Sequence, residues 1–153
     1  MTITKEAVQE ILYLLVRSHD KIIKQIGGEL GIRDEAGLYH SVYRILHYQQ
    51  NHRDNPFKIG AFILLELGKR HHFVDSNKRI AYLAMKIFLI NLGYHFKIGY
   101  KDASYFIIKI IDFHSSIPFD VITNWILENS VHMQLIDLES YLNDLILEFY
   151  YGN

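Results

Sequence analysis

The amino-acid sequence predicts an all-α fold. Apolar residues recur at helical spacing through most of the chain, and several predicted helices begin or end at good capping residues. Two strongly apolar segments near the middle indicate central helices that are buried. With 153 residues, of which 50% are apolar and 22% charged, the chain suits one globular domain and is too short for two of ordinary size.

The first helix is predicted to begin at Thr4, a residue type favoured as an N-cap, and to continue to about Ile26. Gly27 and Gly28 then stop it. Residues 27–36 are rich in turn formers and charged residues. Two interpretations of this segment remain open: an ordinary connection between helices, or an extended edge that holds a substrate segment by strand addition.

Residues 37–48 indicate a second helix, whereas the polar residues 49–55 indicate an exposed loop. A third helix is predicted to begin at Asn55 and Pro56, because Asn is a good N-cap and Pro is favoured at the first helical position. It extends to about Gly68 and carries apolar residues on nearly every side. A helix of this composition must be buried all round.

A fourth helix is predicted over residues 77–92, with Asp75 or Ser76 as its N-cap and Gly93 at its C-terminal end. The polar stretch of residues 70–79 therefore joins two buried helices. Anchoring of this kind holds the groups of a site in place better than a free surface loop does.

The first turn of this fourth helix is predicted to bind an anion. The amides of Asn77, Lys78 and Arg79 have no backbone acceptor within the helix, so they can point toward a ligand. The positive charges of Lys78 and Arg79 oppose the helix dipole unless a polyanion neutralises them. Residues 70–79 therefore have the composition of a phosphate-binding loop rather than that of a core segment.

Two further helices are predicted after the central pair, from residue 102 or 104 to residue 112 and over residues 119–129. The tail, residues 132–151, carries an apolar stripe opposite several acidic residues, and such a stripe must pack on the same domain or on a partner. We thus expect a domain over residues 1–130 and a C-terminal helical extension over residues 131–153.

Composition excludes several classes of protein. The 16 Lys and Arg residues are balanced by 17 Asp and Glu residues, so no overall positive charge favours direct nucleic-acid binding. The absence of Cys excludes thiolate chemistry and fits a reducing compartment. Residues 1–6 lack the build of a signal peptide, and the apolar run 80–90 is interrupted by Lys86 and too short for a membrane span. We expect a cytoplasmic protein without membrane association.

Residues 71–79, His-His-Phe-Val-Asp-Ser-Asn-Lys-Arg, resemble the His-x-Phe-x-Asp-small-Asn-x-Arg signature of the Fic/Doc family. Lys78, where Fic enzymes that transfer AMP usually carry Gly, resembles the Doc (death-on-curing) toxin branch. The resemblance extends over residues 27–38 and 88–94, and it covers roughly residues 5–129. It implies a helical domain with a short flap before the central helices, at the position of the turn-rich segment.

Two residues depart from the family signature. His72 stands where Pro is usual, and Ser76 stands in place of Gly or Ala. Neither position has a catalytic role in the family, and we expect His72 to be a loop or solvent residue.

The resemblance implies a role for each remaining residue of the signature. His71 would be the catalytic base that takes a proton from the attacking hydroxyl, although an imidazole here can also simply cap the preceding helix. Phe73 would hold the loop against the core, and Asp75 would bind Mg²⁺ or cap the following helix. The residues implied to bind the nucleotide are Asp75, Ser76, Asn77, Lys78 and Arg79.

By resemblance to the Doc branch, the expected function is ATP- and Mg²⁺-dependent transfer of phosphate to a Ser, Thr or Tyr hydroxyl of a target protein, with a translation factor as one candidate target. The wider Fic family implies AMP transfer as an alternative, and a catalytically silent binding protein is a third interpretation. A different enzyme class, a hydrolytic metal centre built from His71, His72 and Asp75, has too few further ligands nearby.

Fic proteins are often restrained by a helix whose Glu pairs with the Arg of the signature. The nearest match here is residues 124–129, but Asn124 replaces the hydroxyl residue of the pattern, and the segment is more simply interpreted as a core helix. The resemblance to Doc therefore implies a separate antitoxin as a partner, and a homodimer is also possible.

Overall fold

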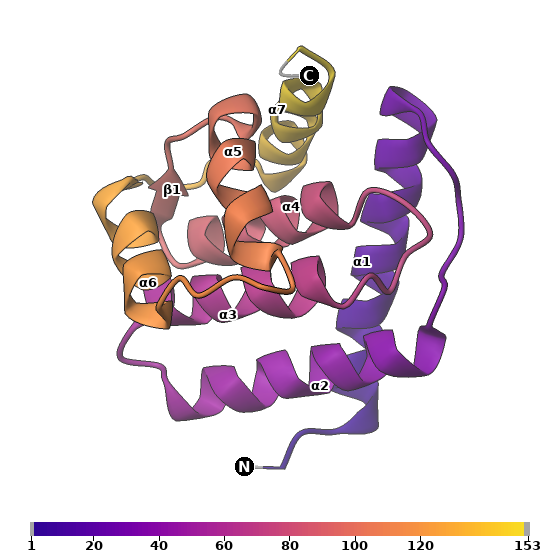
Figure 1. The fold of residues 1–153 in the computed structure, drawn as a ribbon, viewed down its shortest axis with the longest axis horizontal. Helices are drawn as coiled ribbons and strands as arrows, with labels where there is room; N and C mark the ends of the chain where they lie inside the picture. Colours follow the sequence, from indigo (N-terminus) through magenta and orange to yellow (C-terminus); the bar gives the residue numbers. More distant parts are fainter. Residues whose placement is uncertain (1, 152–153) are drawn as a thin grey trace.

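The computed structural model describes residues 2–151, with side chains up to residue 150, and within this range the prediction of an all-α fold is confirmed (Figure 1). Seven helices and one two-stranded sheet make up the described chain. The helices are α1 (Lys5–Ile26), α2 (Glu35–Asn51), α3 (Pro56–Lys69), α4 (Asn77–Asn91), α5 (Tyr100–Ile111), α6 (Phe119–Glu128) and α7 (Leu138–Tyr151). The strands are β1 (Tyr94–Phe96) and β2 (Ser130–His132). None of these helices combines the length and the apolar character that a membrane span requires.

Helices α3 and α4 pack side by side at the centre of the fold, and the other helices surround them (Figure 1). Asn55 caps α3 by accepting a hydrogen bond from the Lys58 amide (3.2 Å), and Pro56 occupies the first helical position, as predicted. From Pro56 to Gly68 every residue of α3 is at least partly buried. The prediction of a helix buried all round is therefore confirmed, and it gives the site a rigid support.

Helix α1 begins and ends where the sequence predicts. Thr4 caps it by accepting a hydrogen bond from the Ala7 amide (3.1 Å), and Gly27 ends it with a φ of 103°. A positive φ of this size is readily adopted only by glycine, which explains why the helix stops there.

Helix α2 is longer than predicted. It continues to Asn51, so the prediction of an exposed loop over residues 49–55 is wrong for the first three of these residues. Tyr48, in the last turn of α2, stacks on Phe62 of α3, with ring centroids 4.1 Å apart. This tertiary contact holds the end of the helix in place although the residues that follow are polar.

The flap, residues 27–34, is an extended segment that connects α1 to α2 and lies beside the loop joining α3 and α4. Ile32 and Phe73 form an antiparallel bridge. The Val74 amide donates a hydrogen bond to the Gly31 carbonyl (3.1 Å). The segment is therefore extended and pairs with the loop between α3 and α4, here called the signature loop, whereas its binding of a substrate segment stays a prediction.

Strands β1 and β2 form a small antiparallel sheet that the sequence did not predict. Tyr94 lies opposite His132, and Phe96 lies opposite Ser130. The sheet pairs the segment that follows α4 with the segment that follows α6. Strands of three residues are too short to show the alternation by which strands are recognised in a sequence.

Helix α7, yellow in Figure 1, packs on α1, α4 and α5 of its own domain. Leu145, Ile146 and Phe149 are buried in this contact. The helix begins at Leu138, so the predicted start near residue 132 is wrong, because the intervening residues belong to β2 and to a loop.

Glu148 of α7 fixes the start of α5. Its carboxylate accepts a hydrogen bond from the backbone amide of Tyr100, the first residue of α5. It also pairs with the buried Lys86 of α4, with 3.5 Å between Nζ and Oε2. Burial lowers the pKa of the Lys86 ammonium, and the negative charge of Glu148 counters part of that shift. The pair joins three helices at one point.

Candidate functional site

A cleft of about 620 Å³ lies between helix α5 and the loop that joins α3 to α4. One wall is formed by His71 and by residues 74–79, which include the first turn of α4. The opposite wall is formed by one face of α5, which includes Tyr100, Ser104 and Tyr105. All residues predicted to act in catalysis or nucleotide binding therefore line the same cleft.

His71 is exposed on the wall of this cleft, two residues after the end of α3. Its backbone lies in the left-handed region, with a φ of 51°. Among the described residues, none forms a hydrogen bond with its imidazole, so the alternative role as a cap of α3 is not seen. Both ring nitrogens remain available to a substrate hydroxyl.

Phe73 holds the loop against the core, as predicted. Its ring is buried and stacks on the ring of His19 from α1, with centroids 4.1 Å apart. Asn77 closes the loop around it, because its Oδ1 accepts from the Phe73 amide (3.1 Å) and its Nδ2 donates to the Phe73 carbonyl (3.0 Å). The predicted contact between Asn77 and a phosphate would have to use the second N–H of the carboxamide.

Asp75 is held by the flap and by its own loop. Its Oδ2 accepts a hydrogen bond from the Glu29 amide (3.2 Å), and its Oδ1 accepts from the Ser76 amide (2.7 Å). Gly28 lies so close that a Cβ atom there would sit 2.6 Å from Oδ2. The absence of a side chain at Gly28 therefore allows the flap backbone to hold this carboxylate. Each oxygen keeps a further lone pair that can bind a cation on the cleft side.

The first turn of α4 carries no side-chain cap. Ser76 is the N-cap residue, with a left-handed backbone (φ 63°, ψ 30°), but it forms no capping hydrogen bond. The amides of this turn therefore have no side-chain acceptor from the N-cap, and the residues that carry them line the cleft.

Two cations lie beside these amides. Among the ion pairs between described residues, none includes Lys78 or Arg79, although both line the cleft. Burial raises the pKa of the Tyr100 hydroxyl on the opposite wall, and the charge of Arg79, together with a hydrogen bond from it, acts against that shift. Positive charge at a helix N-terminus is unfavourable until an anion binds, so the site is electrostatically suited to a polyphosphate.

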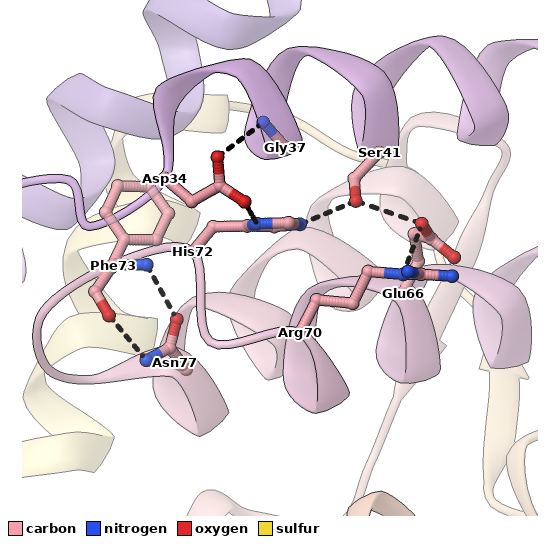
Figure 2. A network of polar contacts seen from close by, with 8 residues as sticks. All are labelled: Asp34, Gly37, Ser41, Glu66, Arg70, His72, Phe73 and Asn77. Carbon is pink, nitrogen blue, oxygen red and sulfur yellow. Dashed lines mark hydrogen bonds and ion pairs between the residues drawn. The ribbon is translucent and has the colours of Figure 1, made fainter.

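His72 lies in the loop, as one part of the expectation has it, but it is not a solvent residue. His72 is buried, with 3% of its surface exposed, and its Nε2 lies 2.6 Å from Oγ of Ser41 in α2 (Figure 2). Ser41 donates its only hydroxyl proton to Glu66 (2.9 Å), so His72 must donate from Nε2. Burial lowers the pKa of His72 despite the negative charges of Asp34 and Glu66. A buried imidazole thus fills the position where the family usually has Pro.

The hydrolytic metal centre suggested by His71, His72 and Asp75 is not formed. The ring of His72 points to Ser41, away from the cleft. Within the described residues, no three His, Cys, Asp or Glu side chains come together in a way that could hold a metal ion.

The segment that most resembles an inhibitory helix belongs to α6, which packs against α3. Glu128 is exposed there, and the ion pairs of the described residues do not include one between Glu128 and Arg79. The simpler interpretation, a helix packed on the core, fits the structure.

Three contributions to the site were missed from the sequence: the flap amide of Glu29, the wall residue Tyr100, and His19. His19 donates from Nε2 to the Asp75 carbonyl (2.7 Å) and is itself buried. A signal for it was present, because it lies on the same helical stripe as the buried Leu15 and Ile22. A polar residue on an apolar stripe indicates a specific hydrogen bond.

Comparison with protein families relates the chain to a known family. The model that describes the Fic/DOC family matches residues 10–89, slightly more than half of the chain. The matched region includes α2, α3, the signature loop and nearly all of α4. No curated protein matches the chain significantly.

Proposed function

Because this chain belongs to the Fic/DOC family of nucleotide-dependent transferases, we propose that it transfers phosphate from ATP to a Ser, Thr or Tyr hydroxyl of a target protein. The observation that carries the proposal is the content of one cleft: a free imidazole, a carboxylate held by backbone amides, and an uncapped helix start with two cations that form no ion pair among the described residues. These are the parts that phosphoryl transfer requires, since the protein contributes mainly position and charge.

In the proposed reaction, the oxygen of the target hydroxyl attacks the γ-phosphorus of ATP. The bond between that phosphorus and the β,γ-bridging oxygen breaks, and ADP leaves with the bond electrons. His71 takes the hydroxyl proton as the new P–O bond forms, because its imidazole is exposed on the cleft wall and has no other partner there. The first-turn amides of α4, Lys78 and Arg79 stabilise the phosphate charge.

The residues present fit a bound Mg²⁺ ion. Asp75 supplies one carboxylate at the cleft, and Mg²⁺ bound with nucleotides commonly uses one or two carboxylates together with phosphate oxygens. When bound, the ion would neutralise phosphate charge. The backbone amides of the flap and loop keep Asp75 in place for this contact.

The choice of phosphate rather than AMP rests on Lys78. AMP transfer would place the α-phosphate beside His71, and the β- and γ-phosphates would then lie along the start of α4. A Gly at position 78 would leave room for them, whereas Lys78 adds bulk and charge on the cleft wall. By similarity to the Doc branch, we propose that the nucleotide binds in the reverse direction and presents its γ-phosphate to the target.

We further propose that the protein acts in the cytoplasm as a Doc-like toxin and that a separate antitoxin restrains it. The unpaired charges of Lys78 and Arg79 in an open cleft would accept an acidic segment of such a partner. A translation factor is a candidate target.

The experiment is incubation of the purified protein with a cell lysate and ATP that carries one label on the α-phosphate and another on the γ-phosphate. The proposal predicts a protein that gains the γ label alone, with ADP as the released nucleotide. A protein that carries the α label would establish AMP transfer instead. If neither label is transferred by wild-type protein under conditions where ATP binds, the chain is a silent member of the fold.

A further inference from the structure

His71 has a backbone conformation that the sequence does not favour. It follows the C-cap residue Arg70 of α3, a position where a left-handed residue is usually Gly. With a φ of 51°, a residue that carries a Cβ atom is strained. Such strain persists only where the surrounding structure fixes the conformation, and the residues on either side of His71 supply groups that can do this.

Glu66, a buried residue of α3, lies at the centre of the contacts around His71. Its Oε1 accepts a hydrogen bond from Oγ of Ser41 at 2.9 Å and forms ion pairs with Nε of Arg70 at 3.0 Å and Nε of Arg44 at 3.2 Å. Only 6% of Glu66 is exposed. A carboxylate buried to this extent requires such donors, and loss of one would leave it incompletely paired.

Two of these contacts connect Glu66 to the residues on either side of His71, one directly and one through Ser41 (Figure 2). Arg70 immediately precedes His71 and reaches Glu66 directly. His72 immediately follows it and reaches Glu66 through Ser41, to which its Nε2 donates at 2.6 Å.

The flap adds a second constraint on the same side. The carbonyl of His72 accepts hydrogen bonds from the amides of Arg33 (2.7 Å) and Asp34 (3.1 Å). Both the side chain and the backbone of His72 are therefore fixed, whereas the imidazole of His71 between the two anchors is left exposed on the cleft wall.

We propose that Glu66 is a positioning residue: with Arg70, Ser41 and His72 it forms a loop clamp that holds the strained backbone of His71 and thereby aims its imidazole into the cleft. The inference rests on the proposed function for the role of His71, but the clamp itself is a statement about conformation. It also accounts for the departure at His72, because Pro has no side chain that could donate to Ser41.

The kinetic test compares two arginines that bind the same oxygen of Glu66. Arg70→Ala removes the donor that leads to the loop, whereas Arg44→Ala removes a donor of similar length whose helix, α2, does not continue into the loop. For Arg70→Ala we expect kcat for transfer to fall about 10- to 100-fold, with KM for ATP unchanged. Arg44→Ala should stay within about two-fold of wild type. Arg70→Lys, which keeps a charge within reach of Glu66, should recover part of the loss. Equal effects of the two Ala substitutions would overturn the proposal.

A stability test works whether or not the wild-type protein transfers anything. Glycine adopts a positive φ without strain, so His71→Gly should melt about 2 to 4 °C above His71→Ala in the otherwise wild-type chain. In an Arg70→Ala background, and again in a Ser41→Ala background, the loop can relax and this difference should shrink toward zero. A difference that stays the same in both backgrounds shows that the clamp does not hold the conformation and overturns the inference. Lack of transfer by wild-type protein, in contrast, contradicts the proposed function alone.

Discussion

Substitution of Gly28 by Ala tests the proposed contact between Asp75 and the metal-bound nucleotide. The new Cβ atom would lie 2.6 Å from Oδ2 of Asp75, and real Cβ contacts are rarely closer than 3.0–3.4 Å. The carboxylate must therefore move by roughly half an ångström or more, and a move of this size lengthens the 3.2 Å hydrogen bond that Oδ2 accepts from the Glu29 amide.

The expected loss of affinity for Mg²⁺-ATP can be estimated from the sensitivity of catalytic sites to the position of their groups. Because a displacement of about 1 Å in a catalytic site can cost about 10²-fold, we expect the smaller displacement of Asp75 to weaken Mg²⁺-ATP binding about 10-fold. The backbone of Gly28 has a φ of 115°, so Ala there also costs about 1–2 kcal/mol of stability. This loss of stability must be separated from the loss of affinity.

Gly27→Ala is the matched control. Gly27 has a φ of 103°, so Ala carries the same kind of backbone strain, but nothing lies within 4 Å of its Cβ position. Melting curves and calorimetric titration with Mg²⁺-ATP should show a similar loss of stability for both variants and a loss of affinity for Gly28→Ala alone. Equal affinities in the two variants would refute the argument that the position of Asp75 matters for nucleotide binding.

Three further predictions concern the signature loop. His71→Ala should lower kcat about 10²- to 10⁴-fold with calorimetric ATP affinity unchanged, and activity close to wild type would remove His71 from the mechanism. Asp75→Ala and Arg79→Ala should each weaken Mg²⁺-ATP binding while the melting temperature stays close to wild type; normal binding by both variants would contradict the phosphate site. His72→Gln should remove a pH-dependent loss of stability: burial lowers the pKa of His72 below its ordinary 6.5, so the unfolded chain binds the proton more readily, and wild-type stability falls as the pH drops below about 6.5. The charged groups that face this imidazole are Asp34, Glu66 and Arg70, with His71 next to it in the chain. Melting temperatures at about pH 7.5 and 5.5 test this role of His72. An equal drop in melting temperature for wild type and variant would show that another group is responsible.

Local signals were enough to predict most helices. Thr4 and Asn55 cap α1 and α3 as expected, because capping depends on a few neighbouring residues. The end of α2 and the start of α7 were not predictable in this way. Tyr48 extends α2 by stacking on a residue from another helix, and the β2 strand occupies the region where the tail helix was expected to start.

The candidate site was also predictable only in part. The signature residues are contiguous, so their gathering at one helix start could be predicted from the sequence. Tyr100 and Glu29 come from other parts of the chain and join the site only when the flap and α5 fold against the loop. His72 was misjudged because its environment depends on Ser41 and Glu66, which no local pattern connects to it.

The contact of Glu148 with the start of α5 joins two segments that both lie outside the matched family region. The matched family region ends at residue 89, whereas α5, which forms the far wall of the cleft, and α7, which fixes the first residue of α5, both lie beyond it. One wall of the cleft is therefore built and held by segments that lie beyond the matched family region. A fragment cut at residue 89 would keep every signature residue and lose the wall that faces them across the cleft.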